Sequence, residues 1–306
     1  MGAIHILLQN SIDYAGLFPP AGLDMEAAVA NYARYARGPD SWALGRFVLP
    51  VDRIDEFKAA ARPHLSIDSG HAPWQLSALV GASIEADLAA VAAFNSETVA
   101  APVPRVLIDS LELKASSNAA VEDSTRMPPP HLQAYIEIPI VGDPSGLVAA
   151  IARSGRRAKV RTGGTTPDAF PSGSDLIRFM TACLRAAVPF KATAGLHHPL
   201  RAEYNLTYAS DSPRGLMFGF LNLFLAAAFL QAGLAEDRAE RLLEERSLES
   251  FQIDEESVLW LGHRLTLGDL RRARRQGLVS FGSCSFTEPL EELQALALLH
   301  SRVSPA

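Results

Sequence analysis

Apolar runs of strand length alternate with amphipathic segments of helix length along most of this chain. The runs lie at 13–18, 42–50, 75–81, 105–115, 132–140 and 278–286, with two more inside 158–199. Such alternation is typical of parallel strands joined by helical crossovers. Eight strands of this kind, without the short charged strands that sheet edges favour, predict an α/β protein folded as a closed (β/α)8 TIM barrel.

The connection before the last strand is much longer than a usual crossover. It contains an uncharged stretch at 215–235, followed by charged helical patterns. Uncharged stretches of this length occur in membrane spans and in helices that are buried on several sides of a large domain. We expect the buried helix and no membrane contact. The pattern therefore predicts one barrel domain over residues 1–306, with a helical insertion or lid at 200–277.

Composition narrows the functional classes. The chain has 306 residues, a net charge of −6 and 20% charged residues, which argues against a nucleic-acid surface. Two cysteines, Cys183 and Cys284, suggest no disulfide framework and fit a reducing cytoplasm. The N-terminal residues lack a basic region and a small-residue cleavage site, so we expect no signal peptide. These features predict a cytoplasmic protein that acts on a small molecule, and the long insertion favours a homo-oligomer.

Two lysines mark the most informative part of the sequence. AKVRTGG at 158–164 and PFKATAGLHHP at 189–199 flank an amphipathic segment, which predicts a βαβ unit. Lys159 and Lys191 would then project from neighbouring strands toward the end of the barrel where active sites lie. Two ammonium groups held close together disfavour each other's protonation, and a neutral lysine is a nucleophile. We therefore predict a nucleophilic lysine in this pair.

Acidic residues are predicted on the same inner face of the barrel. Because side chains alternate along a strand, Glu137 should face inward, as should Lys159 and Arg161. Two alternatives stay open on the fourth strand: Asp109, or the set Ser110, Glu112 and Lys114. Pairing of buried charges would alone explain such residues. Their position at strand ends beside glycine-rich loops favours a functional site instead.

These segments resemble the deoxyribose-phosphate aldolases. AKVRTGG is similar to their sixth strand, near I-K-T-S-T-G, which carries the Schiff-base lysine. FKATAGL is similar to their seventh, near V-K-A-S-G-G-I, whose lysine perturbs the first. FGSCSF is similar to their eighth strand, near F-G-A/T-S-S, whose backbone amides bind the substrate phosphate, and AYIEIPI is similar to the fifth-strand pattern V-I-I-E-T. The resemblance is confined to short segments between the fourth and eighth strands.

The resemblance implies a lyase of the class I aldolase type that needs neither a cofactor nor a bound metal ion. Lys159 would form the Schiff base, Lys191 would lower the pKa of Lys159, and a carboxyl group of Glu137, Asp109 or Glu112 would relay protons. Contacts to an anionic substrate are expected from residues at the strand ends: Arg161, Thr162, Gly163, Thr193, Gly195, His197, His198, Gly282, Ser283 and Tyr14.

The chain also departs from this family. Arg161 replaces a small residue, and His197 and His198 stand in the phosphate loop. Deoxyribose phosphate is therefore not the expected substrate, and Arg161 could instead bind a carboxylate with two hydrogen bonds.

Other types of site stay open. A metal-dependent hydrolase or isomerase would use His197, His198 and a carboxylate such as Glu137, although no H-x-H, H-E-x-x-H or C-x-x-C spacing supports it. A barrel that binds a metabolite without turnover is the other alternative. Cys284, between two serines, is a further possible nucleophile, although small residues there also suit tight packing or a phosphate loop. Cys183 lies in a helical pattern and is expected in the core.

Overall fold

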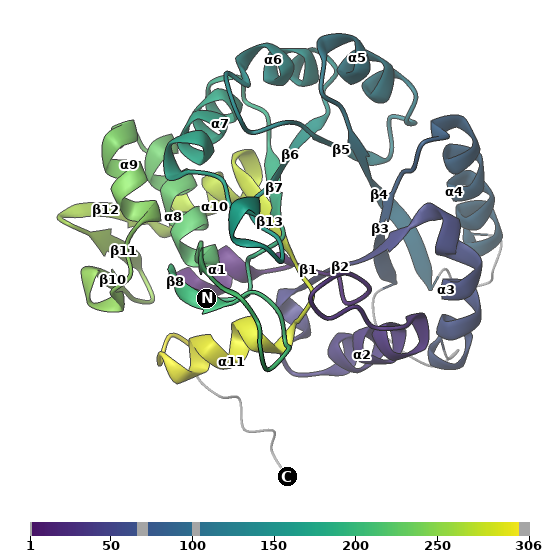
Figure 1. Cartoon of the computed structure of the whole chain (residues 1–306), viewed down its shortest axis with the longest axis horizontal. Coiled ribbons are helices and arrows are strands. Elements are labelled where there is room, and N and C mark those ends of the chain that lie inside the picture. Colours follow the sequence, from purple (N-terminus) through teal and green to yellow (C-terminus); the bar gives the residue numbers. More distant parts are fainter. Residues whose placement is uncertain (1, 66–72, 100–104, 300–306) are drawn as a thin grey trace.

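Eight parallel strands close into a barrel in the computed structural model, which describes residues 2–65, 73–99 and 105–299 (Figure 1). In chain order they are β1 (Ile12–Tyr14), β2 (Leu44–Pro50), β3 (Trp74–Leu79), β4 (Val106–Lys114), β5 (Gln133–Glu137), β6 (Arg157–Arg161), β7 (Phe190–Thr193) and β13 (Leu278–Ser283). Around the barrel the order is β1-β13-β7-β6-β5-β4-β3-β2. The prediction of an α/β protein with a closed parallel barrel is confirmed, and the architecture fits a TIM barrel.

Helices surround this barrel (Figure 1). They include α1 (Ala3–Leu8), α2 (Met25–Arg37), α3 (Ile54–Ala61), α4 (Ile84–Val99), α5 (Asn118–Arg126), α6 (Ser145–Arg153), α7 (Gly173–Arg185) and α11 (Thr287–Ala295). Helix α2 shows how the local sequence favours one of these helices. Asp24 caps α2 by accepting a hydrogen bond from the N–H of Ala27 at 2.7 Å, which satisfies an otherwise unpaired donor. The buried residues of α2 are mostly apolar and recur at helical spacing. They form the single apolar stripe that is typical of a helix packed on one side.

The segment between β7 and β13 contains strands as well as helices. Its elements are the hairpin β8 (Ala202–Asn205) and β9 (Arg214–Met217), the helices α8 (Phe220–Gln231) and α9 (Glu236–Leu243), the antiparallel sheet β10 (Phe251–Ile253), β11 (Ser257–Trp260) and β12 (His263–Thr266), and finally α10 (Leu267–Gln276). The helical insertion predicted at 200–277 is therefore not confirmed as such. Two small antiparallel sheets accompany its helices.

The uncharged stretch forms α8, which is enclosed on several sides. Every residue from Phe220 to Phe229 is buried. The ring of Phe220 stacks on that of Phe281 in β13 at 5.0 Å between centroids, and α9 and α10 pack on other sides of the helix. A helix in such a position needs no polar face. Among the residues that the structure describes, no helix is both long and apolar enough to cross a membrane.

Candidate active site

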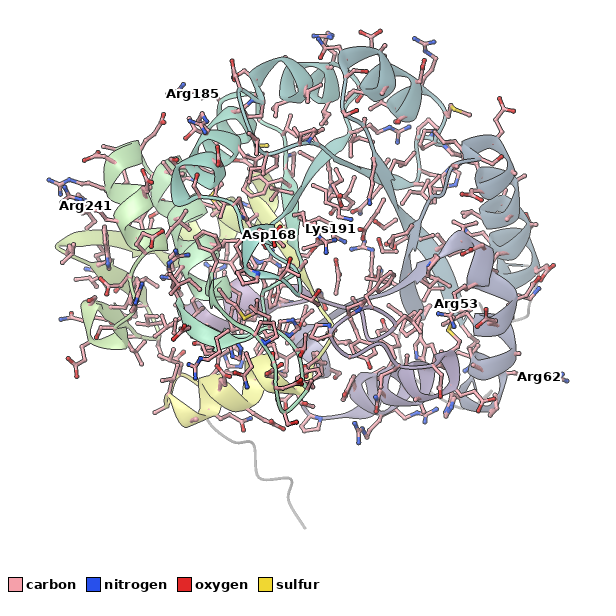
Figure 2. The ribbon with its side chains drawn as sticks, in the orientation of Figure 1. Arg53, Arg62, Asp168, Arg185, Lys191 and Arg241 are labelled. Carbon is pink, nitrogen blue, oxygen red and sulfur yellow. The ribbon has the colours of Figure 1, made fainter. Side chains whose placement is uncertain are left out.

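The strand register places the two predicted lysines side by side. Lys159 of β6 is the direct neighbour of Lys191 in β7 and, on its other side, of Glu137 in β5. Ala158 and Val160, which flank Lys159, are fully buried against the outer helices, so alternation turns Lys159 inward. Figure 2 places Lys191 inside the ring of strands. Both amines therefore lie in the interior of the barrel.

A carboxylate of β4 binds both lysines. Glu112 Oε2 lies 2.6 Å from Lys159 Nζ, and Glu112 Oε1 lies 2.6 Å from Lys191 Nζ. Ser77 Oγ donates a hydrogen bond to Oε1 at 2.8 Å. Burial alone would raise the pKa of Glu112, but the two ammonium groups outweigh burial and hold the pKa below its usual range. Glu112 is therefore ionised near neutral pH and couples the two amines to each other.

Lys191 is held by a second carboxylate, from β1. Its Nζ lies 2.7 Å from Asp13 Oδ2, which also accepts a hydrogen bond from Ser280 Oγ at 3.0 Å. Only 1% of the Lys191 side chain is exposed. Burial alone would lower the pKa of Lys191, but Asp13 and Glu112 raise it above its usual range. Lys191 is thus a protonated, buried ammonium group.

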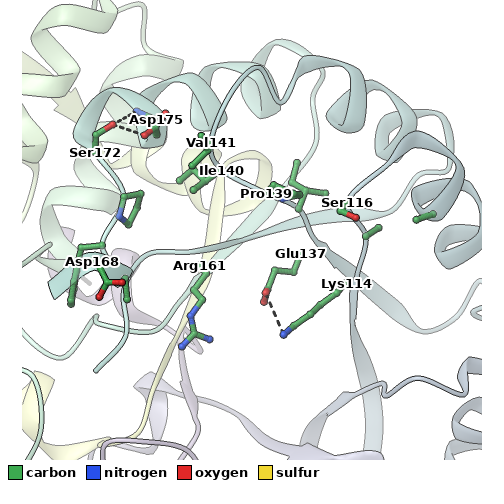
Figure 3. A pocket seen from close by; sticks show the side chains of 16 residues that line it. Lys114, Ser116, Glu137, Pro139, Ile140, Val141, Arg161, Asp168, Ser172 and Asp175 are labelled. Carbon is green, nitrogen blue, oxygen red and sulfur yellow. Dashed lines mark hydrogen bonds and ion pairs between the residues drawn. The ribbon is translucent and has the colours of Figure 1, made fainter. Parts of the chain in front are cut away.

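Lys159 lies nearer to solvent than Lys191. Its Nζ is 2.8 Å from Glu137 Oε2, and 7% and 15% of the two side chains are exposed. On the far side of Glu137, Oε1 lies 3.8 Å from the Nζ of Lys114 (Figure 3). The interior charges therefore form a chain from the rim inward, in the order Glu137, Lys159, Glu112, Lys191 and Asp13.

A cavity of about 240 Å³ adjoins this chain of charges. Lys159, Lys191 and Glu112 line it, together with Leu206 and Met217 from the segment after β7. A second hollow of about 650 Å³ lies beside it, along the ends of β4, β5 and β6 (Figure 3). A small molecule that enters the cavity would therefore lie beside both lysine residues.

Several predicted site residues share this cavity. They are Lys159, Lys191, Arg161, Thr193, Gly195, His197 and Gly282. Glu137 lines the neighbouring hollow instead, while its carboxylate still reaches Lys159. Of the two adjacent histidines, only His197 lines the cavity.

Arg161 differs from the lysines in its partners. Its Nε donates to the carbonyl oxygen of Gly163 at 3.0 Å. No carboxylate binds Arg161 among the residues that the structure describes. It lines both the cavity and the hollow beside it. Its guanidinium is therefore free to bind an anion at the mouth.

Asp109 lies away from the lysines. It stands at a shift of register between β3 and β4, and its carboxylate binds Arg46 with two hydrogen bonds of 2.7 and 2.6 Å. The sequence left two alternatives open on β4, Asp109 or the set that contains Glu112, and the structure places Glu112 at the lysines. The carboxylate on this strand that contacts Lys159 and Lys191 is that of Glu112.

Tyr14 lies on the outer side of β1. Its ring packs against those of Tyr32, Tyr35 and Phe47, and its hydroxyl accepts a hydrogen bond from Asn31. Burial raises the pKa of Tyr14 to about 12. Tyr14 therefore belongs to the packing around α2, whereas its neighbour Asp13 enters the barrel.

The remaining predicted residues shape the loops. Thr162 Oγ1 donates to the carbonyl oxygen of Ala194 at 2.7 Å, tying the end of β6 to the end of β7. Gly163 packs so closely against Phe170 that an added Cβ would meet the ring at 2.5 Å. Ser283 Oγ lies 3.4 Å from His197 Nδ1. These three residues position the loops and lie outside the cavity lining.

His198 belongs to an ion-pair network outside the cavity. Its Nδ1 lies 2.5 Å from Glu292 Oε1, and its ring stacks on Tyr204 at 3.5 Å. The ligand atoms of His198, Glu288 and Glu292 lie within 4.8 Å of one another. Glu288 is engaged by His197 at 3.3 Å, so pairing accounts for the group and we assign no metal to it.

The strand patterns did not single out Asp13, which binds Lys191, or Ser280, which donates a hydrogen bond to Asp13. Nothing in the sequence spacing connects Asp13 to residue 191. In the register of the strands, Asp13 lies beside Gly282 and Ser280 lies beside Lys191. Comparisons with known proteins add no assignment: no family model matches the chain, and searches of curated proteins and of solved structures find no match.

Proposed function

We propose that this protein is a lyase of the class I aldolase type, in which Lys159 forms a Schiff base with a small anionic carbonyl compound. One observation carries the proposal: the amine of Lys159 adjoins a cavity and lies between two carboxylates, one of which also binds a second lysine. Strongly coupled ionisable groups of this kind are typical of sites that transfer protons.

Lys159 is the better nucleophile of the two lysines. Lys191 is almost fully buried and is held by two carboxylates that raise its pKa. Lys159 has one partner in the interior, Glu112, and one at the rim, Glu137, which is partly exposed. A carbonyl group in the cavity would therefore meet the amine of Lys159 with a base beside it.

The neighbouring carboxylates supply the proton transfers that Schiff-base formation needs. Lys159 Nζ gives a proton to Glu137, 2.8 Å away, and the neutral amine adds to the carbonyl carbon. The carbinolamine then loses its oxygen as water after protonation, which leaves an iminium. Glu112 and Lys191, 2.6 Å apart, would hold the local charge balance. The iminium accepts electrons when an adjacent C–C or C–H bond breaks.

The cavity indicates the size and charge of the substrate. Its volume of about 240 Å³ suits a short carbon chain. Arg161 offers a guanidinium at the mouth that no carboxylate binds in the described structure, and guanidinium groups bind carboxylates and phosphates well. Apolar side chains such as Val48 and Leu79 line the rest of the wall. An aldehyde or ketone with one carboxylate or phosphate therefore fits best.

Reductive trapping tests this proposal. The protein is incubated with borohydride and a panel of carboxylated and phosphorylated aldehydes and ketones, and the adducts are mapped by peptide mass spectrometry. We expect a reduced adduct on Lys159 that is absent from Lys159→Met. Lys58→Met is the matched control, because Lys58 is an exposed lysine of α3 that binds Glu97 and should not affect the adduct. An adduct confined to other lysines, or none across the panel, would refute the proposal.

A barrel that binds an anion without turnover is the second candidate. Two observations favour it. Carboxylates already bind both lysines, which opposes a nucleophilic role, and Arg161 beside the cavity has no carboxylate partner among the described residues. Calorimetric titration with the same compounds distinguishes the two. Tight binding with neither turnover nor a trapped adduct would favour the binding protein.

A further inference from the structure

A thiol lies on the wall of the cavity that Lys159 adjoins. Cys284, just after β13, lines it together with His197, from the loop after β7. The Sγ atom of Cys284 lies 3.9 Å from both Nδ1 and Nε2 of His197, so the sulfur lies beside the edge of the imidazole ring. The proposed Schiff-base chemistry uses neither side chain.

His197 carries a positive charge near neutral pH. Its Nδ1 lies 3.3 Å from Glu288 Oε2, at the start of α11. Burial alone would lower the pKa of His197, but its contacts with Cys284 and Glu288 raise the pKa to about 9. An imidazolium 3.9 Å from the sulfur stabilises the negative charge that the sulfur carries when it reacts as a nucleophile.

The other titratable groups around Cys284 are neutral or already paired. Tyr208, from the β8–β9 connection, lies 3.7 Å from Sγ and donates to Glu288 Oε2 at 3.1 Å. Tyr14 approaches from β1, and burial raises the pKa values of both tyrosines. Glu288 is shared between His197 and Tyr208. The imidazolium is thus the cation nearest to the sulfur among these groups.

We propose that Cys284 is an activated thiol and a site of covalent modification by small disulfides that enter the cavity. The Cys284 thiolate attacks one sulfur of the disulfide, a new S–S bond forms, the old S–S bond breaks, and the other half leaves as a thiolate. No further oxidant takes part. A dithiol reverses the exchange. An adduct on Cys284 would occupy part of a cavity of about 240 Å³, so modification would also exclude other molecules from Lys159.

Thiol labelling of the folded protein tests this inference without any knowledge of the substrate. The chain is treated at pH 7 with hydroxyethyl disulfide or with iodoacetamide, and each cysteine is followed by peptide mass spectrometry. Cys183 is an internal control, because it is buried in α7 and burial raises its pKa well above the usual value. We expect Cys284 to react at least about tenfold faster than Cys183, and dithiothreitol to remove the disulfide adduct.

Variants identify the cause of the reactivity. His197→Asn should slow the labelling of Cys284 about tenfold at pH 7, with a smaller effect above pH 9, where a thiol ionises without help. Glu288→Gln removes the negative charge that binds the imidazolium of His197, and it should slow the labelling of Cys284 less than His197→Asn does. His198→Asn is the matched control and should leave the rate unchanged, since His198 binds Glu292 instead.

The labelling rates of these variants decide whether the inference stands. Circular dichroism first checks that each variant is folded. If His197→Asn does not fold, Glu288→Gln takes its place in the comparison of labelling rates. A Cys284 that labels as slowly as Cys183 would overturn the inference, and so would a rate at pH 7 that neither His197→Asn nor Glu288→Gln changes. Because labelling needs no carbonyl compound, these results are independent of whether Lys159 forms a Schiff base.

Discussion

Lys191 and Glu112 meet inside the barrel, with Nζ 2.6 Å from Oε1. Their strands, β7 and β4, are separated by β6 and β5 in the barrel order, so the contact crosses the interior. The two lysine amines therefore influence each other through a carboxylate placed between them. Direct repulsion between bare ammonium groups, which the sequence suggested, is replaced by a chain of alternating charges.

Replacement of Glu112 by glutamine should destabilise the protein strongly. The substitution keeps the shape of the side chain but leaves two buried ammonium groups without their shared negative charge. Loss of one partner from a buried ion pair costs about 3–5 kcal/mol. Urea unfolding monitored by circular dichroism would measure the change in the free energy of unfolding.

Ser77→Ala is the matched control for this prediction. Ser77 donates to the same oxygen of Glu112 at 2.8 Å but carries no charge. Its removal should cost only about 1–2 kcal/mol. An equal loss in both variants would mean that the hydrogen bond, and not the charge of Glu112, holds the network together.

Arg161→Gln should weaken anion binding and leave stability nearly unchanged. The guanidinium has no carboxylate partner in the described structure, so its loss removes no ion pair from the fold. A charge-assisted hydrogen bond contributes about 1.5–3 kcal/mol, which corresponds to a loss of roughly 10- to 100-fold in affinity. Titration with glyoxylate or inorganic phosphate would measure it. Arg241, an exposed arginine of α9, lies far from Lys191 in Figure 2, and Arg241→Gln should change neither property.

Stability should fall between about pH 6.5 and 9 because of His197. The pKa of His197 is raised to about 9 in the folded protein, against about 6.5 in an unfolded chain. Its contribution is therefore complete below pH 6.5 and is lost as the pH rises through 9. The difference is on the order of 3 kcal/mol at most. Unfolding of His197→Asn across this range should show a flatter pH dependence; a parallel curve would contradict the assignment.

Asn222→Leu should destabilise the segment around α8. The buried amide accepts from the N–H of Arg201 at 3.0 Å and donates to the carbonyl oxygens of Leu242 and Glu245 at 2.8 and 2.9 Å. Leucine would remove all three hydrogen bonds, although the carbonyl of Leu242 would still accept one from the N–H of Glu245, at a cost of about 2–4 kcal/mol. Thermal unfolding measures the effect. Gln231→Ala, at the less buried end of the same helix, should cost well under half as much.

The sequence located part of the site and missed part of it. Lys159 and Lys191 could be placed on one face because strand alternation and the glycine-rich ends fix both orientation and height. The choice between Asp109 and Glu112 could not be made, because a shift of register on β4 interrupts the alternation at this point. The contact of Asp13 with Lys191 spans 178 positions, and only closure of the barrel brings these residues together.

By itself, the sequence determined the eight-stranded α/β barrel, the buried character of α8 and the inward direction of the two lysines, because these depend on local periodicity and on burial of apolar faces. The tertiary structure alone decided which carboxylates meet the amines, that His197 and Cys284 share their cavity, and that two small sheets accompany the helices before β13. Those features depend on distances between residues far apart in the chain, which closure of the barrel and packing of its loops set, and which no local pattern encodes.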